Sequence, residues 1–184
     1  MAAPPPGATG APSSVPWVSE SSRRSARPTV PDAWDQYART EVVISRAEGD
    51  LVVRPAPPGV LGEWPWPTDD PLYLLTAWDP GPARPGIEVN RRRQEELEAV
   101  VRPMVSAAWS AVGTDPCTGH REEGIAVGGI SEEVVLEIGA RFGQDAVFAW
   151  SPQGWDTVSC RDGRRRRGGW SLDRAAARPL HYYV

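Results

Sequence analysis

Seven side chains in the middle of the chain stand beside apolar segments and have the chemistry of a small polar site. A carboxylate can exchange protons with a substrate, and amide, guanidinium and indole groups can orient one through hydrogen bonds. We take Glu123 as the candidate general acid–base. The candidate ligand-binding residues are Trp78, Asp79, Asn90, Arg91, Glu122 and Gln144.

A purely structural role for these residues is the alternative. Glu122 and Glu123 cannot both face one site, because side chains alternate along a strand, and either can be a solvated loop carboxylate. Asp79-Pro80 is a common end of a strand. Asn90 can help to order the first turn of a helix, and Gln144 can bond loose backbone groups near a helix end.

Several more specific chemistries lack their full motif. Cys117-x-x-His120 has the spacing of metal ligands, but no second pair of ligands follows it. His120-Arg121-Glu122 lacks the P-C-x-x-C partner of the zinc deaminases. Neither a G-x-G-x-x-G turn nor a G-x-S-x-G elbow is present. We therefore predict no metal and no cofactor.

The composition excludes further classes of function. The chain has 184 residues, a net charge of −4 and 20 arginines without a lysine, so Schiff-base and P-loop lysines are excluded. Its acidity argues against general nucleic-acid binding. The run Arg164–Arg167 is an exception, interpreted either as part of a solvated tail or as a weak site for an anion or nucleic acid.

Changes in composition divide the chain into three parts. Residues 1–30 are rich in Pro, Ala, Gly and Ser and are predicted to be a disordered tail. Residues 31–160 are predicted to form a single α/β domain. Residues 161–184 are predicted to be a flexible, Arg-rich C-terminal tail.

The predicted domain begins with a short helix and a hairpin, followed by a proline-rich connection over residues 55–71. Apolar periodicity and capping residues then predict strands and helices in alternation. The predicted helices are 31–39, 87–102 and 131–143, and the predicted strands are 40–45, 51–54, 72–78, 106–113, 124–130, 145–150 and 155–160.

The strand–helix–strand–strand–helix–strand order over residues 72–150 predicts a ferredoxin-like, split βαβ sandwich. Two helices would cover one face of an antiparallel sheet; a three-layer α/β arrangement is the alternative. In the sandwich, the end of the first strand, the turn between the second and third strands and the entry to the fourth strand lie at one edge. The candidate residues and the loop His120–Glu123 are therefore expected to cluster there.

Four segments carry a resemblance to a known family. They are Thr76-Ala77-Trp78-Asp79-Pro80, Glu88-Val89-Asn90-Arg91, Arg121-Glu122-Glu123-Gly124 and Arg141-Phe142-Gly143-Gln144. Together they resemble a family of small bacterial proteins catalogued as a domain of unknown function, over about residues 34–160. Asp79 stands where the family usually has Asn. The resemblance implies a domain boundary and a set of residues, and no activity.

The leading functional hypothesis is an accessory module that binds a small molecule or a protein through its polar sheet edge. The alternatives are a small enzyme with Glu123 as general acid–base, and weak anion or nucleic-acid binding through Arg164–Arg167. Residues 1–16 lack the features of a secretory signal, and no apolar run has transmembrane length. We therefore expect a cytoplasmic protein without a membrane partner.

Overall fold

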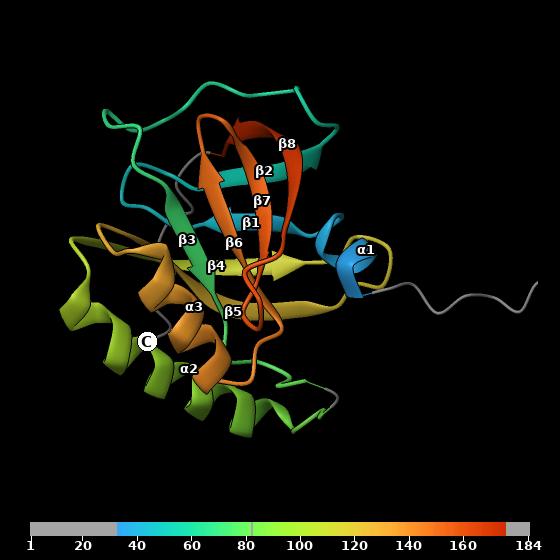
Figure 1. Cartoon of the computed structure of the whole chain (residues 1–184), viewed down its shortest axis with the longest axis vertical. Helices are drawn as coiled ribbons and strands as arrows, with labels where there is room; N and C mark the ends of the chain where they lie inside the picture. Colours follow the sequence, from blue (N-terminus) through green and yellow to red (C-terminus); the bar gives the residue numbers. More distant parts are fainter. Residues whose placement is uncertain (1–32, 82, 176–184) are drawn as a thin grey trace, which may run out of the picture. The chain divides into compact units, whose positions relative to one another are not determined.

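The computed structural model describes residues 33–81 and 83–175. In this part of the chain eight antiparallel strands form a closed barrel in the order β1-β2-β8-β7-β6-β3-β5-β4, and β4 pairs with β1 to close it (Figure 1). The strands are β1 (Glu41–Ile44), β2 (Leu51–Ala56), β3 (Leu72–Leu75), β4 (Ala107–Thr114), β5 (Arg121–Gly128), β6 (Ala146–Ser151), β7 (Gly154–Ser159) and β8 (Arg165–Arg174).

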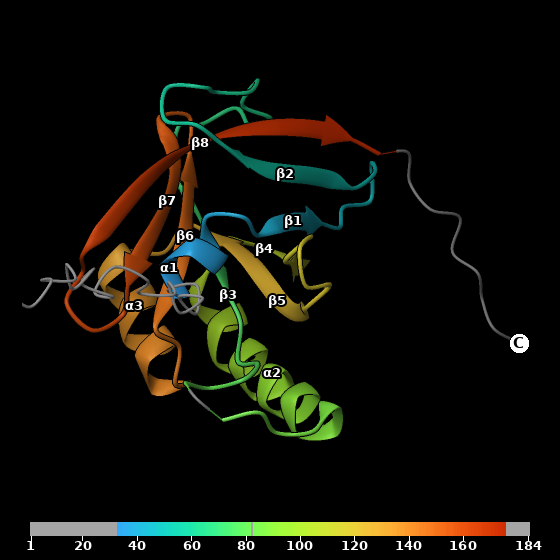
Figure 2. The ribbon, with the colours of Figure 1, turned by 90° about the vertical axis from the view of Figure 1, so that its right-hand side faces the viewer.

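The helices lie outside the barrel. α2 and α3 lie beside each other near β3 and β6, whereas the short α1 lies near β1 (Figures 1 and 2). None of the helices in the described residues is long and apolar enough to cross a membrane. The helical elements are α1 (Ala33–Tyr37), α2 (Ile87–Val101), the 3₁₀ turn η1 (Arg102–Met104) and α3 (Glu132–Arg141).

The prediction of a ferredoxin-like sandwich is wrong. The predicted succession β3-α2-β4-β5-α3-β6 is present, and its four strands are neighbours in the sheet. The sheet does not stop at these strands, because β1 pairs with the outer side of β4 and β7 pairs with the outer side of β6. The hairpin β1–β2 and the strands β7 and β8 complete a barrel in which every strand has two neighbours.

β8 lies within the residues predicted to be a C-terminal tail. It pairs with β2 from Leu51↔Arg174 to Ala56↔Gly169, and with β7 from Trp155↔Gly168 to Val158↔Arg165. It also places Trp170, which is fully buried, in the core. Residues 161–175 are therefore part of the folded domain, whereas the predicted tail over residues 1–30 lies outside the described residues.

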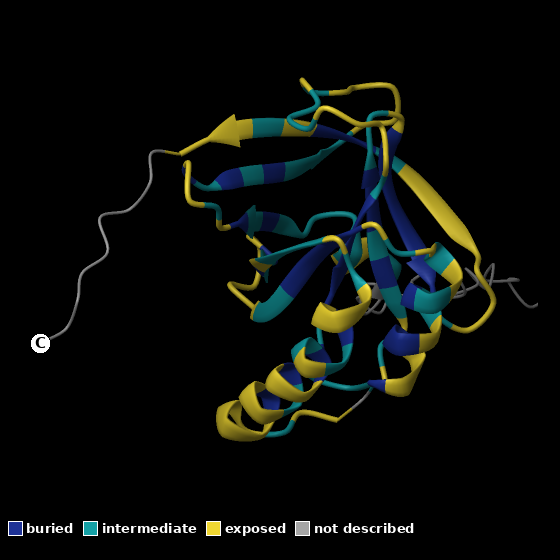
Figure 3. Ribbon diagram, turned by 90° about the vertical axis from the view of Figure 1, so that its left-hand side faces the viewer, coloured by how far each residue is buried: buried dark blue, intermediate teal, exposed yellow. Residues whose placement is uncertain are grey.

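Two apolar layers lie on opposite faces of the sheet. β3 shows the division, because its side chains alternate: Leu72 and Leu74 belong to the barrel interior, and Tyr73 and Leu75 to the layer under the helices. Both faces of β3 are covered, so all four of its residues are buried (Figure 3). The layer under the helices includes Leu97 of α2 and Val135 of α3.

Tryptophan side chains fill much of the barrel interior. Trp150, Trp155 and Trp170 are almost fully buried and pack edge to face around Trp150, with ring centroids 5.2–6.2 Å apart. Trp64 and Trp66, from the proline-rich connection, each pack against Trp150 at 5.0 Å. This connection therefore closes one part of the barrel interior.

Candidate functional site

The segment 76–79 leaves β3 and runs toward α2 with backbone groups that no strand or helix satisfies. Side chains of α2 bond these groups instead. Gln94 accepts a hydrogen bond from the Ala77 amide at 3.0 Å, and Asn90 accepts one from the Asp79 amide at 3.1 Å. Asn90 and Gln94 are 3% and 4% exposed. The polar positions in the buried stripe of α2 therefore hold the segment that follows β3.

The junction between α3 and β6 holds the same segment from its other side. The Gln144 amide nitrogen donates to the Trp78 carbonyl at 2.7 Å, and the Gly81 amide donates to the Gly143 carbonyl at 3.0 Å. The Arg93 side chain donates to the Ala77 carbonyl at 3.0 Å. Gln144 therefore bonds the backbone of this segment and also lies near the site.

Asp79 stands at the turn of this segment with a positive φ of 42°. Among residues other than glycine, Asn and Asp enter this left-handed region most readily, because their short polar side chains hydrogen-bond locally. The Asn90 amide nitrogen donates to one carboxylate oxygen of Asp79, Oδ1, at 2.9 Å. The Asp79 side chain is 9% exposed, and its second oxygen, Oδ2, is directed toward His120.

The loop between β4 and β5 positions His120. The carboxylate of Asp115 accepts hydrogen bonds from the Cys117 amide at 2.9 Å and from Arg39 at 3.2 Å, and these bonds lower the pKa of Asp115. The Asp115 amide donates to the His120 carbonyl at 2.9 Å. Hydrogen bonds thus join the two ends of this turn, and His120 directly precedes β5.

Glu122 and Glu123 lie on opposite faces of β5, as alternation requires. Glu122 lines a pocket, and its Oε1 lies 2.9 Å from Nε2 of His120. Burial raises the pKa of Glu122, and the hydrogen bond with His120 acts against that rise. Glu123 is 41% exposed outside the pocket lining, with its carboxylate 3.9 Å from the Arg91 guanidinium.

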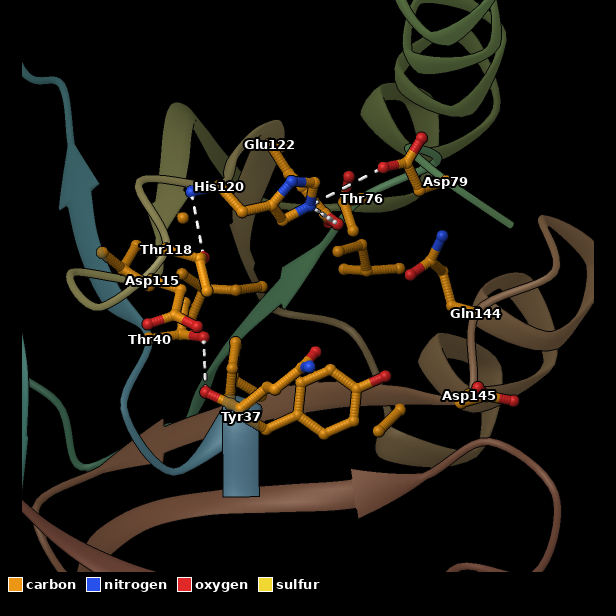
Figure 4. Close-up of a pocket in the computed structure, with 18 of the residues that line it drawn as sticks. Tyr37, Thr40, Thr76, Asp79, Asp115, Thr118, His120, Glu122, Gln144 and Asp145 are labelled. Atoms are coloured by element: carbon orange, nitrogen blue, oxygen red, sulfur yellow. Dashed lines mark hydrogen bonds and ion pairs between the residues drawn. The ribbon is translucent and has the colours of Figure 1, made fainter. Parts of the chain in front are cut away.

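The pocket lies where α1, the β3–α2 segment and the β4–β5 loop meet, and its volume is about 400 Å³. Figure 4 shows Asp79, His120 and Glu122 directed toward one another on one wall, with Tyr37 on the opposite wall. Burial raises the pKa of Tyr37 to about 12, so its hydroxyl keeps its proton at neutral pH. Other polar lining residues are Gln36, Thr40, Thr76, Arg84, Asp115, Thr118, Gln144 and Asp145.

The structure brings some of the predicted site residues together and separates others. Asp79, Glu122 and Gln144 line the pocket, and Asn90 lies behind Asp79. Arg91 and Glu123 contact each other outside the lining, and Trp78 is also absent from it.

His120 lies in the loop that was predicted to reach this edge but was given no role, and Tyr37 was not among the predicted site residues. The signal for His120 was its place two residues before Glu122, just before β5 begins at Arg121. Tyr37 carried no comparable signal.

The four arginines of the run Arg164–Arg167 contact other groups of the same chain. Arg165 and Arg167 bond the buried carboxylate of Asp156 at 2.7 and 2.9 Å. Arg166 lies 3.1 Å from Asp35, and the Arg164 guanidinium lies 4.4 Å from the ring centroid of Trp34. The run therefore connects β8 to β7 and α1.

Comparison with known proteins gives a family match over part of the chain and no activity. No curated protein and no solved structure matches the chain. All four motifs of the resemblance lie between residues 75 and 147. That segment matches the family described as "Protein of unknown function (DUF3293)", which confirms the resemblance for this part of the chain.

Proposed function

We propose that this protein binds a small polar molecule in the pocket between α1, the β3–α2 segment and the β4–β5 loop. The observation that carries the proposal is the pocket itself. Its volume of about 400 Å³ falls within the range of small-molecule sites, and its polar groups come from segments far apart in the sequence. We therefore propose this pocket, and not a flat sheet edge, as the binding site of the module.

The charges around the pocket favour a neutral or positively charged ligand. Its lining contains four carboxylates, those of Asp79, Asp115, Glu122 and Asp145, against the single guanidinium of Arg84. The carboxylate of Asp115 is already paired with Arg39, which leaves the others to set the local potential. Tyr37 adds a hydroxyl that donates a hydrogen bond to the ligand.

The two alternatives have less support. An enzyme with Glu123 as general acid–base would need that carboxylate in the pocket, and it lies instead beside Arg91. Weak nucleic-acid binding through Arg164–Arg167 would have to compete with the contacts that these side chains make within the chain. Residence in the cytoplasm and a protein partner are kept as part of the proposal.

The test is to identify small molecules that co-purify with the full chain by mass spectrometry. Ala146 lines the pocket at the start of β6, so Ala146→Leu should fill part of the pocket and reduce the amount of the molecule that co-purifies. Ala140→Leu makes the same substitution at an exposed position of α3, and this variant should retain the co-purifying molecule. Equal amounts on the native protein and both variants, or nothing bound to any of them, would overturn the proposal.

A further inference from the structure

Three atoms of the kind that ligate metal ions converge on one wall of the pocket. Within the described residues, a carboxylate oxygen of Asp79, Nε2 of His120 and a carboxylate oxygen of Glu122 all lie within 4.8 Å of one another. We propose that Asp79, His120 and Glu122 bind a divalent transition-metal ion such as zinc or manganese. This inference rests on the proposed function, because it assigns part of the same pocket to a metal ion.

The distances between these atoms suit a shared ion. Ligand atoms about 2.1 Å from a metal ion lie roughly 3 Å apart at right angles and about 3.4 Å apart in a tetrahedron. Nε2 of His120 lies 2.9 Å from Oε1 of Glu122 and 3.7 Å from Oδ2 of Asp79. An ion can therefore be accommodated by small side-chain rotations.

Asp79 presents its second carboxylate oxygen to this position. Its side chain is more than nine-tenths buried, and Oδ1 accepts the hydrogen bond from Asn90. The ion pairs of Oδ2 in the described part of the chain are long, at 3.7 Å to Nε2 of His120 and 3.8 Å to Nε of Arg84. A carboxylate in a largely buried side chain is costly unless charges or hydrogen bonds compensate it, and a metal ion would supply a charge next to Oδ2.

Groups behind the three residues fix their orientation, as is usual around metal ligands. Asn90 holds Asp79 in its left-handed turn through two hydrogen bonds. Asp115 ties the loop that presents His120. Glu122 follows two residues later within β5, so its position is set by the strand.

The ligand types select the class of ion. One imidazole with two carboxylates suits zinc, iron or manganese better than magnesium or calcium, which prefer oxygen ligands alone. Three protein ligands leave coordination positions open toward the pocket, as in catalytic sites and not in closed structural ones. A small polar molecule in the pocket would thus reach the ion.

Titration calorimetry of the full chain, stripped of metal with a chelator, tests the inference with MnCl2 and ZnCl2 as probes. We expect one ion per chain. Asp79→Asn, His120→Ala and Glu122→Gln should each weaken binding at least about 10-fold, since changes behind metal ligands already cost 10–100-fold. Asp79→Asn preserves the turn because Asn tolerates a positive φ, and thermal unfolding of each variant shows whether it is folded.

Two control variants separate this site from binding elsewhere. Glu123→Gln removes the same charge one residue away, outside the pocket, and Cys117→Ser removes the exposed thiol nearest in sequence to His120. Both should bind as the native chain does. No binding by the native chain, or equal loss in Glu122→Gln and Glu123→Gln, would overturn the inference. Neither result depends on the co-purifying molecule, so the proposed function is tested separately.

Discussion

Asn90 and Gln144 hold the segment that carries Asp79 into the pocket, and Gln144 also lines the pocket. Asn90 bonds both the amide and the carboxylate of Asp79, and Gln144 bonds the carbonyl just before it. The bond of Gln144 to the backbone was foreseen as a structural alternative. Asn90 was expected to order the first turn of a helix, and it holds the segment before α2 instead. The motif around Asp79 is therefore held by motifs 11 and 65 residues later in the chain.

We expect Asn90→Ala to destabilise the protein by about 1–3 kcal/mol, because it leaves the partly buried amide of Asp79 without its partner. The free energy of unfolding from denaturant titration measures this cost. Arg91→Ala, at the next and exposed position, is the matched control and should stay within about 0.5 kcal/mol. Equal effects of the two substitutions would contradict the structural role of Asn90.

At the scale of the elements, the helices and the central strands were predictable because their sequences carry clear patterns. Ser131 caps α3, and its side chain accepts the Val134 amide as expected for an N-cap. The buried residues of α2 follow helical spacing from Asn90 to Val101, whereas Ile87 at its start is 52% exposed. Local periodicity thus identified most elements and their buried faces.

Barrel closure left no comparable pattern in the sequence. β8 begins with three consecutive arginines, so the sequence does not show the alternation between its two faces. In the structure Arg165 and Arg167 contact Asp156, and Arg166 contacts Asp35. The pairing of β1 with β4 joins strands more than 60 residues apart. Such long-range pairing depends on the whole chain and not on local propensity.

Removing β8 should therefore abolish cooperative folding. A chain that ends at residue 160 loses Trp170 from the core and leaves β2 and β7 each with an unpaired edge. A chain that ends at residue 175 keeps every described strand and is the control. Circular dichroism during thermal unfolding distinguishes them; a sharp transition for the shorter chain near that of the control would show that β8 is dispensable.

At the scale of the whole molecule, one buried carboxylate connects two strands of the barrel to α3 through arginines of β8. Asp156 of β7 is 3% exposed and bonds Arg165 and Arg167 of β8. Arg165 also bonds Glu132 at the start of α3, at 2.5 Å. Burial raises the pKa of Asp156, but the two arginines outweigh it and the pKa is lowered.

This lowered pKa gives an expected dependence of stability on pH. Below the ordinary carboxyl pKa of 3.8 the unfolded chain takes up the Asp156 proton before the folded one does, so stability falls as the pH falls through the folded pKa. Above that range the contribution of Asp156 to stability is complete.

Asp156→Asn should lower the free energy of unfolding by about 1–3 kcal/mol at neutral pH and should reduce the loss of stability on acidification. Asp173→Asn, at a position paired with Arg54 but 67% exposed, should stay within about 0.5 kcal/mol and keep the acid dependence of the native chain. The measurement is the free energy of unfolding between pH 3 and pH 7. If the curve of Asp156→Asn ran parallel to that of the native chain, the contacts between β7, β8 and α3 would not contribute to acid stability.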